Sequence, residues 1–378
     1  MLKKMKKIFP YSNAIVFCIF SLQSCLIDVP PSPASQKNNP DIIIPPVINS
    51  AINDSIASLI EYKDTGVILS SSTINNKLQT ILKSTYHLGF PDIVKYKDTW
   101  YISVRFSEGH LPINFGHVIL FKSGDLKTWV PEQIFTQEGY DLRDPKLFVA
   151  DNTLYVHFHS TTINPYGDIR NDYISKYSIF SNSWETAQKI NKNTNMKSWF
   201  WRISYFDGTF YTGAYKSGEP LKLFKSIDGI NFEEICKFNL EGNLTESTIK
   251  YYDKQVYILI RVKDRNTLLG KANENDLTTW AFNELPIKEL GGPNFLKYEN
   301  NFLIGGRSNN KTTLYYYNYS TNKLKELFIL PSVQDNGYPG MYIDNNLLNI
   351  VYYSGSNTGE YLINLVIINL NEAKLVFN

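Results

Sequence analysis

Carboxylates, arginines and a tyrosine stand in similar short motifs along the chain, among them "GFPDIV", "LRDPKL", "LTESTI" and "GYPGMY". The side chains in these motifs that suit catalysis are Asp92, Asp144, Glu246 and Tyr338. A pair of carboxylates can hydrolyse a glycosidic bond, with one as proton donor and the other activating water. A carboxylate beside a phenol can instead accept its proton and make the phenol oxygen a nucleophile. These residue types therefore predict glycoside hydrolysis, provided that the fold brings them together.

A second polar set lies beside these motifs or at the ends of the strands that follow them. It consists of Arg105, Glu108, Arg143, His159, Arg202, Arg261 and Arg307. Arginine forks bind carboxylates through two hydrogen bonds, whereas a neutral sugar needs few of them. We therefore expect this set to bind an anionic sugar, such as a sialic acid, a uronic acid or a sulfated residue.

The motifs open six copies of one hairpin, each with an apolar run, a polar turn and an aromatic strand. Two further strands with a tight turn between them follow most copies. Four antiparallel strands repeated at roughly 45 residues are typical of a β-propeller blade. The sequence predicts an all-β, six-bladed propeller over residues 87–378, with a five-bladed one as the alternative.

The first strands of all blades start on one face of a propeller, so the motifs should converge on one rim. A pocket is expected there. The alternative is that these charged groups only pair with one another across a wet channel, because buried charges are costly unless they are paired.

The turns "KSGDLKTW" (122–129) and "KSIDGINF" (225–232) resemble Asp boxes, the Ser-x-Asp-x-Gly-x-x-Trp turns of six-bladed sialidases. The resemblance implies that Tyr338 is a nucleophile paired with Glu246. It also implies that Arg261 and Arg307 are two of the three arginines that hold the substrate carboxylate. Gly89 stands where the first arginine of the family belongs. No aspartate matches the family's acid–base group near "RFSEGH", where the nearest carboxylate is that of Glu108.

A second resemblance competes with the first. "FPDIVKYKDTWYISV" and "DPKLFVADNTLYVHF" look like blade openings of five-bladed family 43 glycosidases. That resemblance implies a catalytic triad of Asp92, Asp144 and Glu246. The count of six repeats favours the sialidase-like alternative.

The N-terminal residues read as a targeting segment. A basic "MLKKMKK" precedes an apolar run over residues 14–22, and "LQSC" resembles a bacterial lipobox ending at Cys25. The pattern predicts a signal peptide over 1–24 and a tether rich in Pro, Ser and Asn over 25–50 that starts at lipidated Cys25. Residues 51–86 would follow, with "TGVILSSS" as a possible blade-closing strand. We expect a bacterial membrane lipoprotein that faces the periplasm or the cell surface.

The balance of 38 Lys+Arg against 36 Asp+Glu argues against a nucleic-acid binder. We expect no cofactor and no metal, because the five histidines show no compact ligand spacing, although His110 and His159 could face the rim and serve in acid–base chemistry. The expected partners are a glycan, the membrane through the lipid anchor alone, and neighbouring glycan-processing proteins. A glycoside hydrolase and a non-catalytic glycan-binding propeller both fit this pattern.

Overall fold

The computed structural model describes residues 58–61, 67–71, 74–112, 114–163, 170–192 and 197–377. They form β-strands and one terminal helix, α2 (Leu370–Phe377). The predicted signal peptide, Cys25 and the tether over 25–50 lie outside the described residues. Within the described part, no helix is both long enough and apolar enough to span a lipid bilayer.

Three sheets of four strands each follow one another along the chain, and each is a simple antiparallel meander. The first consists of β12 (Trp199–Phe206), β13 (Thr209–Tyr215), β14 (Leu221–Ser226) and β15 (Glu233–Phe238). The second consists of β16 (Asn243–Tyr252), β17 (Gln255–Lys263), β18 (Asn266–Asn273) and β19 (Asp276–Lys288). The third consists of β20 (Gly291–Tyr298), β21 (Asn301–Ser308), β22 (Lys311–Asn318) and β23 (Lys323–Ile329).

A nine-stranded sheet precedes them and contains two antiparallel units. One unit consists of β3 (His87–Tyr96), β4 (Thr99–Ser107), β5 (Gly116–Ser123) and β6 (Val130–Phe135). The other consists of β7 (Tyr140–Ala150), β8 (Thr153–Thr162), β9 (Arg170–Ser178), β10 (Ser183–Trp184) and β11 (Gln188–Lys189). The two units are joined by one parallel pair, Gly116 with Asp141.

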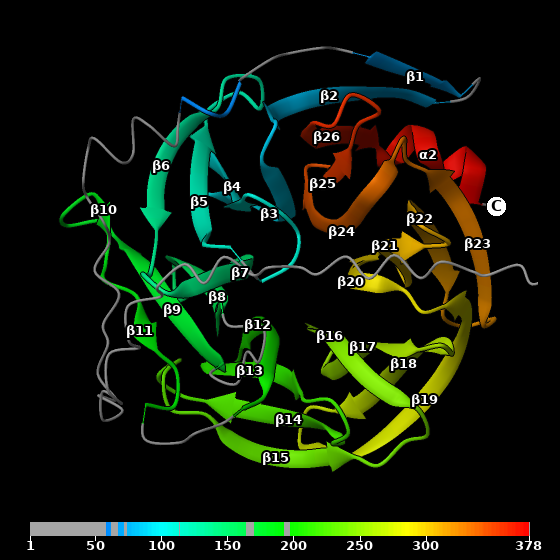
Figure 1. Cartoon of the computed structure of the whole chain (residues 1–378). Coiled ribbons are helices and arrows are strands. Elements are labelled where there is room, and N and C mark those ends of the chain that lie inside the picture. Colours follow the sequence, from blue (N-terminus) through cyan, green and yellow to red (C-terminus); the bar gives the residue numbers. More distant parts are fainter. Residues whose placement is uncertain are drawn as a thin grey trace, which may run out of the picture. The chain divides into compact units, whose positions relative to one another are not determined.

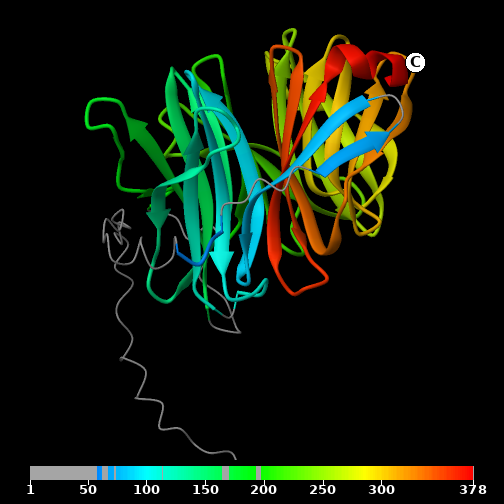
Figure 2. The same cartoon turned by 90° about the horizontal axis from the view of Figure 1, so that it is seen from above.

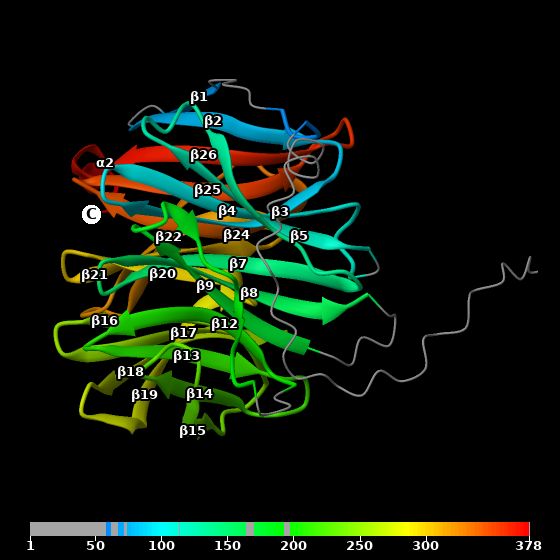
Figure 3. The same cartoon turned by 90° about the vertical axis from the view of Figure 1, so that its left-hand side faces the viewer.

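The last sheet combines the two ends of the described chain, as Figures 1 and 3 show. Its strands are β24 (Val333–Asp344), β25 (Leu347–Gly355), β26 (Tyr361–Asn369), β2 (Ile74–Ser84) and β1 (Val67–Ser71). β2 pairs directly with β26, whereas β1 pairs with β2. The predicted closing segment "TGVILSSS" contains β1, so the strand that adjoins β26 is the next one along the chain.

The inner strands β3, β7, β12, β16, β20 and β24 contact one another in a closed ring, with β24 returning to β3. Figure 1 shows them around the centre, and Figure 2, turned by 90°, shows the strands running along the axis. Aliphatic and aromatic side chains fill the space between sheets, for example Ile102 and Phe121 against Val351 and Leu365. Each such fully buried side chain contributes about 1.5–3 kcal/mol. The fold is an all-β propeller, which confirms the predicted fold class at that level.

Every inner strand carries a β-bulge at the same relative place. The unpaired residues are Phe90-Pro91, Asp144-Pro145, Trp201-Arg202, Thr245-Glu246, Gly292-Pro293 and Tyr338-Pro339. Proline fits there because it has no N–H for the ladder, and a bulge redirects the side chains beside it. These bulges turn six pairs of residues out of the regular alternation near the axis.

Candidate functional site

Tyr338 and Glu246 meet at the bulges of β24 and β16. The Tyr338 hydroxyl donates a hydrogen bond of 2.8 Å to Glu246 Oε1. Glu246 also accepts hydrogen bonds from Arg261 Nη1 at 2.8 Å and from the backbone N–H of Gly292 at 2.6 Å. A Cβ at position 292 would lie 2.6 Å from Tyr338 Cα, and φ there is +60°. Glycine therefore lets β20 approach close enough to fix both side chains.

The electrostatics keep Tyr338 protonated until a base removes its proton. Burial, followed by the Glu246 carboxylate, raises the pKa of Tyr338 well above its ordinary value. Arg307 and Arg261 lower this pKa, but they do not overcome the other two effects. Because the hydroxyl already points at Glu246, proton transfer to that carboxylate is the direct way to form a phenolate.

Arg261 and Arg307 line a cleft of about 220 Å³, together with Lys288, Glu289, Asn309 and Asn310. Arg261 Nη2 donates to Glu289 at 2.5 Å. Arg307 Nη1 donates to Asp335 at 3.4 Å, and its guanidinium lies 5.3 Å from the Tyr338 ring. Three cations against one carboxylate in the cleft lining suit an anionic ligand.

Arg143 is the third arginine near this group. It lies on β7, donates to Asp141 at 3.2 Å and pairs with Asp144 at 3.5 Å. Its guanidinium is 5.2 Å from the Phe90 ring. Burial lowers the pKa of Arg143, but the carboxylates of Asp144 and Asp141 more than offset this and raise it, so Arg143 remains charged.

Arg105, also predicted to bind substrate, lies on β4 and is fully buried. It donates to Asp141 at 2.8 Å and to the carbonyl oxygen of Gly109 at 2.9 Å. The neighbouring Gly89 has no room for a side chain, because a Cβ there would lie 2.4 Å from the His87 ring. The His87 ring thus occupies the space where the sialidase resemblance places an arginine.

Asp92 and Asp144 are both held by arginines. Arg202 Nη1 donates to Asp92 at 2.7 Å, and the Leu147 N–H donates to the same oxygen at 2.9 Å. The motifs "GFPDIV" and "LRDPKL" suggest equivalent places for Asp92 and Asp144, but Phe90 occupies the bulge position of Asp144. Asp92 comes two residues later, past the bulge, and is only 1% exposed.

Sequence reasoning missed Lys146, a buried residue that lies among the proposed acids. Burial, followed by Arg202, lowers the pKa of Lys146 to about 8, although Asp92, Asp144 and Glu246 each raise it. Its ammonium donates to the carbonyl oxygen of Phe90 at 3.3 Å. A cation beside three carboxylates partly neutralises the interior of the ring.

Glu108 and His159 lie apart from the Tyr338–Glu246 pair. Glu108 is exposed and lines a separate cavity of about 430 Å³ with Tyr86, Phe106 and other residues. His159 is fully buried, bonds to Asp172 at 3.0 Å and stacks on Trp199 at 3.8 Å. Their predicted contact with substrate stays a prediction.

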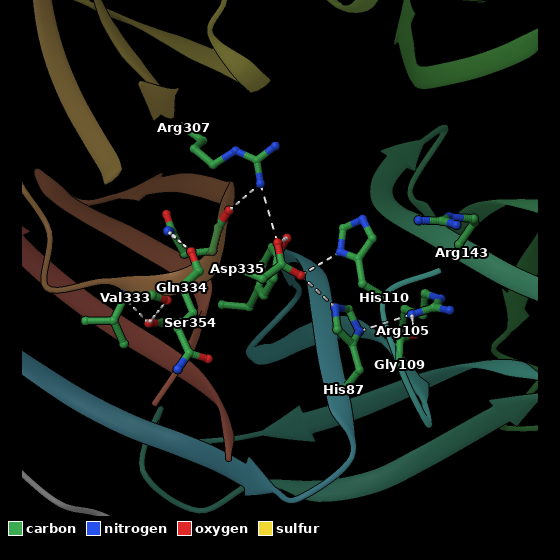
Figure 4. A network of polar contacts seen from close by, with 12 residues as sticks. His87, Arg105, Gly109, His110, Arg143, Arg307, Val333, Gln334, Asp335 and Ser354 are labelled. Carbon is green, nitrogen blue, oxygen red and sulfur yellow. Dashed lines mark hydrogen bonds and ion pairs between the residues drawn. The ribbon is translucent and has the colours of Figure 1, made fainter. Parts of the chain in front are cut away.

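A second polar network, centred on Asp335, is shown in Figure 4. Asp335 bonds to His110 Nδ1 at 2.5 Å, to His87 Nε2 at 3.1 Å and to the Tyr353 hydroxyl at 2.8 Å. Sequence analysis did not select Asp335, although it lies only three residues before Tyr338 in "QDNGYPG".

The ligand atoms of His87, His110 and Asp335 lie within 4.8 Å of one another, a spacing that could hold a metal ion. Arg105 Nη1 faces His87 Nδ1 at 3.1 Å, and arginine can only donate. Burial is the main cause that lowers the pKa of His87 to about 4, so the ring is neutral and carries its proton on Nε2. That proton faces Asp335, and hydrogen bonding therefore explains the cluster better than metal binding.

The two turns that resemble Asp boxes have matching hydrogen bonds. Asp228 accepts from the N–H groups of Ile230 and Asn231, both at 2.8 Å, and from Ser226. Asp125 accepts in the same way from Lys127 and Thr128. Both turns join the third and fourth strands of their units, so they lie at the outer edges of the sheets and away from the inner strands.

No protein-family model matches the sequence, and no curated protein matches it. Solved structures do match. A protein of unknown function from Dyadobacter fermentans gives a TM-score of 0.65 at 16% identity, over 82% of this chain and 99% of that one.

Two sialidase structures are also similar. Trypanosoma rangeli sialidase in complex with sialic acid gives a TM-score of 0.59 at 13% identity, over 84% of this chain and 59% of that one. The phage phi92 endosialidase gives 0.64 at 12% identity, over 79% and 69%. This chain thus spans less than two thirds of the Trypanosoma sialidase. At these identities the likeness concerns the fold, and the fold is a sialidase-like propeller.

Proposed function

We propose that this chain is a glycoside hydrolase that acts on glycans with an acidic sugar at the bacterial envelope. The observation that carries the proposal is the 2.8 Å hydrogen bond from the Tyr338 hydroxyl to Glu246, next to the cleft lined by Arg261 and Arg307. The nine-stranded sheet counts as two blades, which gives six in total. The likeness to sialidases, one of them in complex with sialic acid, supports this assignment.

In the proposed reaction, Arg261 and Arg307 hold the carboxylate of the sugar. Glu246 takes the proton of Tyr338 while the phenol oxygen attacks the anomeric carbon, and the aglycone oxygen leaves with a proton. Water then attacks the tyrosyl glycoside, and Glu246 returns its proton to the tyrosine oxygen. The sugar is released with retained configuration, because two displacements occur at one carbon.

The scheme with Asp92, Asp144 and Glu246 as the catalytic triad has less support. Arg202 and a backbone N–H both bond to Oδ2 of the buried Asp92, and Arg143 holds Asp144. A non-catalytic glycan-binding propeller is the second candidate. Gly89 in place of the family's first arginine favours it, because a site with fewer arginines can still bind an anion.

The test incubates the purified protein with glycans that carry sialic or uronic acids, and mass spectrometry follows the released sugars. Glu246→Gln and Asp92→Asn serve as the matched pair. Because Asp92→Asn removes the partner of Arg202, circular dichroism checks that this variant is folded at the assay temperature. We expect release by the wild type that is lost in Glu246→Gln and kept in folded Asp92→Asn. The reverse pattern would favour the family 43-like triad. Binding by calorimetry without any release would show a glycan-binding protein.

We also propose that Cys25 anchors the chain in the membrane of a bacterial envelope. Metabolic labelling with a fatty acid tests this. We expect labelled protein in the membrane fraction, and a Cys25→Ser variant that is not labelled. Equal labelling of both would contradict the anchor.

A further inference from the structure

We propose that His110, oriented by Asp335, is the acid–base group of the Tyr338–Glu246 site. This inference rests on the proposed glycosidase function. Hydrolysis of an unactivated glycoside needs a proton donor for the leaving oxygen. Glu246 is already committed to Tyr338, so a different group has to supply that proton.

His110 and Asp335 form a carboxylate–imidazole pair. His110 Nδ1 lies 2.5 Å from Asp335 Oδ2. In such a pair the carboxylate fixes the tautomer and orientation of the ring and stabilises its charged form. Asp335 is itself held by Tyr353, by Arg307 and by His87.

The charge state of Asp335 suits this role. Burial raises the pKa of Asp335, but the hydrogen bonds from His110 and His87 outweigh it, and the pKa falls well below its ordinary value. Asp335 is therefore a carboxylate throughout the physiological range, and its negative charge lies directly beside the His110 ring.

The second nitrogen of His110 is free to face a ligand. The His110 side chain is 40% exposed, whereas that of His87 is fully buried. In Figure 4 Nε2 of His110 points away from Asp335, on the side where Arg307 and Arg143 lie. Within the described residues, Nε2 takes part in no hydrogen bond. Of the two histidines on Asp335, only His110 can therefore exchange a proton with a bound molecule.

The pair adjoins the nucleophile. The Phe90 ring lies 5.5 Å from His110 and 5.1 Å from Tyr338, so one aromatic ring separates the two groups. Arg307 links them on the other side, because it bonds to Asp335 and lies over the Tyr338 ring. A sugar held by Arg307 would thus have Tyr338 and His110 near the same bond.

The charged and titratable groups around His110 come from three strands. Asp335, on β24, contacts one nitrogen of the ring. Arg307, on β21, contacts Asp335. His87, on β3, lies edge-on with ring centres 5.3 Å apart and is neutral, with a pKa of about 4. Among the described residues, His110 therefore contacts one carboxylate directly and no cation.

Protons and bonds balance in both displacements of the proposed reaction. The protonated ring of His110 gives its Nε2 proton to the glycosidic oxygen as the carbon–oxygen bond breaks, and the aglycone leaves as a neutral alcohol. The neutral ring then takes a proton from the water that attacks the tyrosyl glycoside. His110, Glu246 and Tyr338 return to their starting states, and the net reaction is glycoside plus water to sugar plus alcohol.

The test compares two leaving groups on one sugar. Methyl and 4-nitrophenyl glycosides of sialic acid, and the same pair with glucuronic acid, are assayed with wild type, His110→Gln and His117→Gln. Nitrophenol leaves without protonation, whereas methanol does not. We expect His110→Gln to slow the methyl glycosides by about 100-fold or more and the nitrophenyl glycosides by less than about tenfold. His117→Gln, the same change at a histidine on β5, should change neither rate.

A second measurement distinguishes the loss of an acid–base group from a loss of activity that a changed structure would cause. Azide attacks the tyrosyl glycoside without a base, so it should accelerate turnover of the nitrophenyl substrate by His110→Gln and not by the wild type. Equal losses on both substrates, with no effect of azide, would overturn the role of His110 and leave the glycosidase proposal standing. If the wild type hydrolyses neither pair of glycosides and no glycan, both proposals fail.

Discussion

Protonation of the buried His87 should make the stability of this protein depend on pH in a narrow acidic range. The ring is fully buried and accepts a hydrogen bond from Arg105, so a proton on Nδ1 would break that bond and place a second cation beside the guanidinium. Burial is the largest of the causes that lower the pKa of His87, from 6.5 to about 4. The unfolded chain therefore binds this proton at a higher pH than the folded protein does.

The sign and size of the effect follow from this difference. The contribution of His87 to stability is fully present above the unfolded pKa, and it is lost as the pH falls towards the folded pKa. A gap from 6.5 to about 4, at about 1.4 kcal/mol per pKa unit, amounts to about 3 kcal/mol. We expect the free energy of unfolding to fall by that amount between about pH 7 and pH 4, in addition to the effects of other groups.

Denaturant unfolding at a series of pH values measures this, with His87→Gln as the matched variant. A glutamine amide can donate to Asp335 and accept from Arg105, but it does not titrate. The wild type should lose about 3 kcal/mol more than His87→Gln over this range. Parallel curves for the two proteins would refute the reasoning, because they would mean that His87 is not held neutral by the fold.

The other predictions concern the arginine cleft, the buried ion pair and the outer turns. Arg307→Lys should weaken binding of an acidic sugar by about 10- to 100-fold, because an ammonium cannot form two parallel hydrogen bonds to a carboxylate. Calorimetry measures the affinity, with a neutral analogue of the sugar as the control. An equal loss of affinity for both sugars would contradict the binding of a carboxylate in this cleft. Asp92→Asn should lower the free energy of unfolding by about 3–5 kcal/mol, because Arg202 is left buried without its partner. A decrease in the free energy of unfolding below about 1 kcal/mol, measured with denaturant, would contradict this. Asp228→Ala should lower the free energy of unfolding by about 1–2 kcal/mol, because its hydrogen bonds within the turn are lost, and should leave the release of sugar unchanged. A loss of activity at an unchanged melting temperature would contradict a purely structural role for this turn.

The propeller fold could be predicted from the sequence because each repeat is marked by features of neighbouring residues. Each hairpin has its own apolar alternation and polar turn, and four of the six inner-strand bulges are marked by a residue followed by proline, as in Phe90-Pro91 and Tyr338-Pro339. Matching the acids of the two motifs misplaces Asp92 by two residues, whereas matching their prolines makes Phe90 equivalent to Asp144. Strand closure was harder to predict, since the pairing of β2 with β26 joins residues almost 300 positions apart in sequence.

The site was only partly predictable, because its decisive contacts are long-range. The motifs correctly place Glu246 and Tyr338 within the bulges of two inner strands, Glu246 as the second bulge residue and Tyr338 as the first. Only the folded chain gives their hydrogen bond. Nothing local shows that Arg105 is buried against Asp141. Asp335 escaped notice because it belongs to no copy of the repeat motif.

The most direct test of Tyr338 as the nucleophile is to look for a sugar bound covalently to this residue. The reaction is quenched in acid during turnover of an acidic glycoside, and the digested protein is mapped by mass spectrometry. Glu246→Gln is run in parallel as a variant that should not form the intermediate, because a glutamine amide cannot take the Tyr338 proton. We expect a peptide containing Tyr338 that is heavier by one glycosyl residue, and a Tyr338→Phe variant that neither forms this adduct nor releases the sugar. Undiminished release by Tyr338→Phe, or an adduct on another residue, would contradict it.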